Sequence, residues 1–124
     1  MQHRYSDEFS SPPALILPVE VHAPRRVDAG MSCRGKVDTA ADLSVLPRQC
    51  IKHLKLVAFN TLSIRQTGRQ EWSYLVEIVV EGRRYSVEAI THDRPYILLG
   101  RDILNDVKLI ADGPSEVFEI VRRR

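Results

Sequence analysis

Alternation of apolar and polar residues between positions 61 and 90 constrains the fold of this chain more than any other feature of its sequence. Leu62 and Ile64 alternate with polar neighbours, and the stretch 74–80 again has a period of two. Because successive side chains of a β-strand point to opposite faces, this period is typical of strands with one buried face. No long segment has the periodicity of a helix, so we expect a mainly β fold.

Turn signals join these segments into hairpins. A Thr-Gly pair at 67–68 and a Glu-Gly pair at 81–82 each separate two alternating segments, as expected for tight hairpin turns. The nearly continuous apolar run at 96–100 predicts a strand buried on both faces. Short helices are expected over 47–54, which a proline begins, and over 101–106.

The length of 124 residues is that of a single domain. We expect residues 1–13, which are polar and end in Ser-Ser-Pro-Pro, to form a mobile N-terminal arm. Residues 14–121 would be the domain and 122–124 a basic tail. The N-terminus lacks the layout of a signal peptide, and the apolar run at 14–17 is too short to span a bilayer. These features predict a cytoplasmic protein without a membrane partner.

Composition argues against several classes of site. The cysteines, Cys33 and Cys50, and four scattered histidines lack the spacing of a zinc site, so we predict no metal and no cofactor. Two cysteines allow one disulfide, but nothing indicates an oxidising compartment. The net charge of +2 and small arginine clumps fall short of a basic stripe with interleaved aromatic residues. We expect no nucleic-acid partner; a nucleic-acid-associated β-barrel is an alternative that rests on the clumps alone.

Asp38 lies at the end of a predicted strand over 33–37 and is followed by the small residues Thr39, Ala40 and Ala41. A carboxylate in this position either forms a turn or is a reactive group on a rigid support. Taken alone, the turn is the commoner role of such an aspartate.

Two motifs together resemble the retropepsin-like aspartic proteases. Residues 37–46, VDTAADLSVL, are similar to that family's active-site loop, hydrophobic-Asp-Thr-Gly-Ala-Asp/Ser followed by an apolar pair. Residues 96–104, YILLGRDIL, are similar to its second loop, apolar-apolar-Gly-Arg-Asp/Asn. Their order and spacing and the hairpins between them also match, over about residues 14–121. The resemblance implies a retropepsin-like closed β-barrel subunit with a flap hairpin and one or two short helices.

The resemblance further implies an aspartic endopeptidase that acts as a homodimer and hydrolyses peptide bonds of extended protein segments. Asp38 of each chain would face its own copy and share one proton with it, and the pair would activate a water. The mechanism needs no metal and no covalent intermediate. The resemblance leaves the terminal segment 116–121 either interleaved with that of the partner or an ordinary edge strand.

The same resemblance implies roles for other residues. For each of them the alternative is an ordinary structural role, as a turn residue, a surface charge or the end of a strand. Asp42 and Arg101 match an ion pair beside the substrate cleft. The implied residues are, in the catalytic loop, Asp38, Thr39 and Ala40; in contact with substrate, Ala41, Asp42, Gln66, Thr67 and Gly68; and in support of the site, Gly100 and Arg101.

Ala40 departs from the pattern, which has glycine at this position. If the backbone there needs a positive φ, or if the partner packs against it, the added methyl group costs activity; otherwise alanine is harmless. The alternative function is therefore a catalytically weak or inactive retropepsin-fold dimer that serves as a peptide-binding or assembly module.

Overall fold

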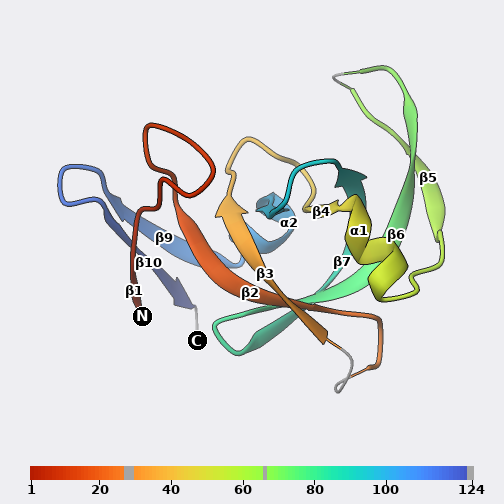
Figure 1. The fold of residues 1–124 in the computed structure, drawn as a ribbon, viewed down its shortest axis with the longest axis horizontal. Coiled ribbons are helices and arrows are strands. Elements are labelled where there is room, and N and C mark those ends of the chain that lie inside the picture. Colours follow the sequence, from red (N-terminus) through yellow and green to blue (C-terminus); the bar gives the residue numbers. More distant parts are fainter. Residues whose placement is uncertain (27–29, 66, 123–124) are drawn as a thin grey trace.

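The computed structural model describes residues 1–26, 30–65 and 67–122, and it consists mainly of β-strands (Figure 1). The prediction of a mainly β fold is confirmed. The strands are β1 (Gln2–Arg4), β2 (Ile16–His22), β3 (Gly30–Val37), β4 (Val45–Pro47), β5 (Asn60–Ser63), β6 (Gln70–Val80), β7 (Arg83–His92), β8 (Ile97–Leu99), β9 (Val107–Asp112) and β10 (Val117–Arg122). The helices are α1 (Arg48–His53) and α2 (Arg101–Leu104), within the two predicted segments.

Six of these strands close into a barrel. Their order is β2-β3-β8-β4-β7-β6, and β2 pairs back onto β6 through Glu20–His22. Closure gives each of these strands a neighbour on both sides, which removes the exposed edges of an open sheet. The closed barrel expected from the sequence is therefore confirmed.

The interior of the barrel explains the sequence periodicity. Val76, Ile78 and Val80 of β6 are buried, whereas the residues between them face outward or are half-buried. In β8, Ile97 and Leu99 are fully buried and Leu98 is half-buried. The strand that was expected to be buried on both faces is therefore fully buried on one face only. Burial of each such aliphatic side chain contributes about 1.5–3 kcal/mol to stability.

The hairpin of β5 and the start of β6 extends from the barrel (Figure 1). Ser63 pairs with Gln70, and Gly68 at the turn has a φ of 68°, a conformation that glycine adopts without strain. The predicted turn at 67–68 thus lies at the tip of the hairpin. Gln66 lies outside the described residues.

The N-terminal segment belongs to the folded unit, which differs from the expectation of a separate mobile arm. Gln2–Arg4 pair with β10, and the Tyr5 N–H donates to the Glu116 carbonyl oxygen at 2.8 Å. Further on, the rings of Phe9 and Tyr96 lie 4.9 Å apart. The segment is polar on average, and its few aromatic side chains find partners that are distant in the sequence.

β10 is the middle strand of a second sheet, of order β1-β10-β9. Along Val117–Glu119 it pairs with β1 on one edge and with β9 on the other. It is neither an edge strand nor free to interleave with a partner along these residues. Of the predicted basic tail, residue 122 ends β10, and 123–124 lie outside the described residues. In the described part of the chain, no helix is long and apolar enough to cross a membrane.

Candidate active site

Asp38 directly follows β3, at the point where β3 runs parallel to β8. Its N–H donates to the Leu99 carbonyl oxygen at 3.0 Å, and the preceding Val37 N–H donates to the Leu15 carbonyl oxygen at 2.9 Å. The aspartate is therefore anchored to the barrel on both sides of β3 before the chain leaves the sheet. Its side chain is half-buried.

The Asp38 carboxylate also forms the turn that the sequence allows as its simpler role. Its Oδ1 accepts from the Ala40 N–H at 3.0 Å, and its carbonyl oxygen accepts from the Ala41 N–H at 3.2 Å. Within the described residues, Oδ2 has no hydrogen-bond partner. The turn and the presented carboxylate are thus compatible, because one oxygen fixes the loop and the other is available.

Arg101, the first residue of α2, holds the loop formed by residues 38–42. Its guanidinium donates to the Thr39 carbonyl oxygen at 2.9 Å and forms an ion pair with Asp42. Its N–H donates to the Ala41 carbonyl oxygen at 2.9 Å. The expected ion pair is present. Because the Asp42 side chain is 75% exposed, we attribute to the pair a geometric role and at most about 1 kcal/mol of stability.

Ser44 and Asp102, which the sequence analysis did not single out, join the two loops. The fully buried Ser44 hydroxyl donates to Asp102 Oδ1 at 2.7 Å and accepts from the Gly100 N–H at 3.1 Å. The Ser44 N–H donates to Asp102 Oδ2 at 2.8 Å. A serine two residues after Asp42 and an acidic residue after Arg101 are the only sequence signals of this network, and 58 positions separate the partners.

Gly100 is required for close approach of the two loops. A Cβ atom at this position would lie 2.6 Å from both the carbonyl carbon and the carbonyl oxygen of Leu43, and 3.0 Å from the Ala41 carbonyl oxygen. Its φ of −89° is accessible to any residue. Lack of a side chain, and not backbone freedom, is therefore what this position demands.

Ala40 needs no unusual backbone conformation. It is exposed, and it does not belong to the described non-glycine residues with positive φ, which are Arg25, Lys55, Glu81 and Glu116. The first of the two conditions under which alanine would be harmful is therefore not met. The second condition, packing of a partner chain against the methyl group, concerns the dimer.

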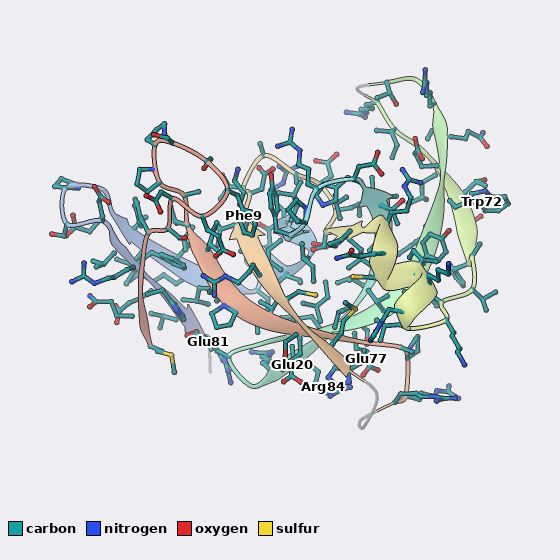
Figure 2. All side chains as sticks on the ribbon, in the orientation of Figure 1. Phe9, Glu20, Trp72, Glu77, Glu81 and Arg84 are labelled. Carbon is teal, nitrogen blue, oxygen red and sulfur yellow. The ribbon has the colours of Figure 1, made fainter. Side chains whose placement is uncertain are left out.

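The hairpin tip and the Asp38 loop are not joined by hydrogen bonds among the described residues. The bonds at the tip are internal: the Ile64 N–H donates to the Arg69 carbonyl oxygen at 2.9 Å and the Arg69 N–H to Thr67 Oγ1 at 3.2 Å. In Figure 1 the tip and the loop that follows β3 lie along the same upper side of the molecule. Trp72, 61% exposed, points away from the barrel (Figure 2).

The described residues contain no group of three or more His, Cys, Asp or Glu side chains that could hold a metal ion. Asp42 and Asp102 are occupied by Arg101 and Ser44. The chain offers one available carboxylate at the end of β3.

No family model matches the sequence, and no curated protein matches it. Among solved structures, the chain is similar to EIAV protease complexed with the inhibitor HBY-793, with a TM-score of 0.56, 24% identity, and coverage of 79% of this chain and 91% of that one. A retropepsin-like aspartic protease from Rickettsia conorii has a TM-score of 0.62 at 13% identity, covering 97% and 90%.

A foamy viral protease-reverse transcriptase in complex with an RNA/DNA hybrid matches with a TM-score of 0.55 and 18% identity over 73% of this chain. The chain spans only 12% of that protein's length. At these identities the similarity concerns the fold. The closed six-stranded barrel and the two short helices agree with it, and the chain has the retropepsin-like fold.

Proposed function

We propose that this chain is one subunit of a homodimeric aspartic endopeptidase. The observation that carries the proposal is the position of Asp38, anchored to β8 through its backbone and presenting one unoccupied carboxylate oxygen. The loop that holds it is fixed by Arg101 at Thr39 and Asp42. Such a carboxylate on a preorganised support is suited to proton transfer.

The need for a second copy follows from the carboxylates around Asp38. In the mechanism proposed here, one carboxyl group acts as base and a second as acid on the peptide bond, and the two lie close enough to share a proton. Within the described residues, Asp42 and Asp102 are engaged by Arg101 and Ser44 and neither bonds to Asp38. A second Asp38, brought by an identical chain across a two-fold axis, completes the pair.

In the proposed reaction the two Asp38 side chains hold one proton and titrate as a unit. The ionised carboxylate takes a proton from a water that attacks the peptide carbonyl carbon. The protonated carboxyl donates to the carbonyl oxygen, and a proton then passes to the leaving amine. Thr39, exposed beside Asp38, is available to the loop of the partner.

The substrate would be a peptide in extended form between the loop and the hairpin. Ala41 and the hairpin tip at Thr67 and Gly68 would contact this peptide on its two faces. We keep Gln66 and Asp42 in this set as part of the proposal. Because β1 already occupies an edge of β10, the dimer would form without strand exchange along Val117–Glu119.

The alternative, an inactive peptide-binding or assembly module, drew its main support from Ala40. That residue is exposed and free of positive φ, which supports the active enzyme over the module. Both alternatives share the fold and the dimer, and they differ in turnover.

Cleavage of an unfolded protein by the wild type and by Asp38→Asn, from about pH 3 to 8, tests the proposal. We expect turnover at acidic pH by the wild type alone, abolished by a statine-type transition-state mimic. Asp38→Asn should remain folded and dimeric. Equal turnover by both proteins, or a wild-type rate that rises through alkaline pH, would contradict the role of Asp38.

A further inference from the structure

The second sheet has an open edge along β9. This strand pairs with β10 over its whole length, from Val107 opposite Arg122 to Asp112 opposite Val117, and no other described strand pairs with it. Alternate backbone N–H and C=O groups on its outer edge therefore lack a strand partner. With six residues, β9 is longer than β1 and β5, the other strands that end a sheet, which have three and four.

Of the features that commonly block an open edge, β9 has a lysine but no proline and no bulge. Its side chains alternate between two faces. Val107 and Leu109 pack against the hydrophobic cluster, whereas Lys108, Ile110 and Asp112 are exposed on the opposite face. Ile110 keeps 42% of its surface exposed, which is a large fraction for an isoleucine in a sheet.

The charges on this exposed face are symmetric about Ile110. Lys108 lies two residues before it and Asp112 two residues after it. Within the described residues neither charge belongs to an ion pair, and Asp112 uses only Oδ1, which accepts from the Ser115 N–H at 3.2 Å. When a second β9 runs antiparallel with Ile110 opposite its own copy, each Lys108 lies opposite an Asp112 of the other chain. The lysine then attracts the partner strand instead of blocking it.

We propose that the chain self-associates through β9, which pairs antiparallel with β9 of a second copy about a two-fold axis at Ile110. The two three-stranded sheets then form one sheet of order β1-β10-β9-β9-β10-β1. Opposite residues of this pairing point to the same face, so both barrels lie on the same side of the combined sheet. Val121, 42% exposed and opposite Lys108 on β10, adds apolar surface to the face that carries Ile110.

Other pairings of two β9 strands lose this complementarity. A parallel pairing in register places Lys108 opposite Lys108 and Asp112 opposite Asp112, which is repulsive. An antiparallel register shifted by two residues places Ile110 opposite Lys108 or opposite Asp112, according to the direction of the shift. The charge pattern therefore selects one register, and it selects an identical chain as the partner, because an identical chain satisfies both charges at once.

The inference goes beyond the proposed function, which needs a second copy but names no interface. Because β10 is paired on both sides along Val117–Glu119, the outer edge of β9 is the longest one that the second sheet leaves open. The hairpin of β9 and β10 lies at the opposite end of the molecule from the hairpin of β5 and β6 (Figure 1). Pairing at β9 therefore leaves the second of these hairpins uncovered. No step of the reaction at Asp38 enters the inference.

Sedimentation equilibrium of the full chain, from micromolar to several hundred micromolar concentration, tests the interface. We expect a reversible dimer, and hydrogen exchange at the β9 amides that slows as the dimer forms. Lys108→Asp and Asp112→Lys each place two pairs of like charges across the axis, so each variant alone should dimerise at least about tenfold more weakly. An equimolar mixture of the two should dimerise about as tightly as the wild type, because every introduced charge then faces an opposite one.

Lys52→Asp, a charge reversal at an exposed residue of α1, is the control and should leave dimerisation unchanged. Circular dichroism shows whether each variant is folded. The proposal is overturned if the wild type stays monomeric or its β9 amides gain no protection with concentration, which needs no variant. It is also overturned if either single reversal dimerises like the wild type, or if the two folded variants fail to associate when mixed. Cleavage is not measured, so these failures are separate from a loss of the proposed function.

Discussion

An added methyl group at Gly100 would lie 2.6 Å from the backbone of Leu43, closer than real side-chain atoms approach backbone. The two loops of the candidate site touch at this residue, so the clash cannot be relieved without separating them. Gly100→Ala should therefore lower the free energy of unfolding by about 2–4 kcal/mol. Urea denaturation measures the loss.

Gly113 provides the matched control for this prediction. A Cβ atom there would meet nothing within 4 Å, and its φ is not positive. Gly113→Ala should change stability by less than about 0.5 kcal/mol. Equal effects of the two substitutions would show that the loops do not pack as described.

Substitution of Arg101 should lower catalytic activity more than it lowers stability. Arg101→Met keeps the aliphatic stem and removes the donors to Thr39 and Asp42. Because the ion pair is exposed, stability should change by no more than about 1 kcal/mol, whereas kcat/KM should fall by about 10- to 100-fold as the loop loses its geometry.

Arg48→Met is the control for Arg101, since Arg48 pairs with Asp93 in another exposed ion pair that does not touch the Asp38 loop. It should leave kcat/KM within about twofold of the wild type. A comparable loss of activity in both variants would mean that surface charge in general, and not the contacts of Arg101 with Thr39 and Asp42, supports the site.

At the scale of elements, the hairpins and the barrel strands follow from local patterns. The alternation in β6 and β7 and glycines at the turns specify them without distant information. The sequence does not specify that Tyr5 and Phe9 pack on β10 and Tyr96, or that Ser44 bonds to Asp102, because these partners are far apart along the chain. Motif spacing singled out Asp38 and Arg101 as candidates, whereas the bonds of Ser44 to Asp102 and Gly100 became visible only in the structure.

His92, at the junction between β7 and β8, should make the stability of the fold depend on pH. His92 Nε2 lies 2.6 Å from the Tyr96 carbonyl oxygen, with Asp93 and Arg94 nearby. Burial lowers the pKa of His92, with Arg94 adding to the effect, while the Tyr96 carbonyl and Asp93 oppose it. Between the lowered folded-state pKa of His92 and about pH 6.5, the unfolded chain therefore binds a proton that the folded chain does not.

It follows that stability falls as pH drops through about 6.5 and stops falling once pH is below the folded-state pKa. His92→Gln can still donate to the carbonyl but does not titrate, so its stability should decline less between about pH 7.5 and 5.5. The exposed His53→Gln serves as the control. A decline as steep in His92→Gln as in the wild type would contradict the assignment.

At the scale of the whole molecule, the fold explains why one chain is half of the proposed enzyme. The barrel presents the Asp38 carboxylate at the end of β3, and the described residues supply no second carboxylate bonded to it. The second sheet, in which β10 lies between β1 and β9, belongs to the same chain. Activity should therefore depend on the concentration of dimer and on both copies of Asp38.

Mixing wild type with Asp38→Asn at a fixed total concentration tests this dependence most directly. After subunits exchange at random in an equal mixture, about one quarter of the dimers carry two aspartates. If the site needs both, activity falls to about one quarter of that of wild type alone at the same total concentration. Activity near one half would mean that each chain carries a complete site, and would contradict the shared-site account.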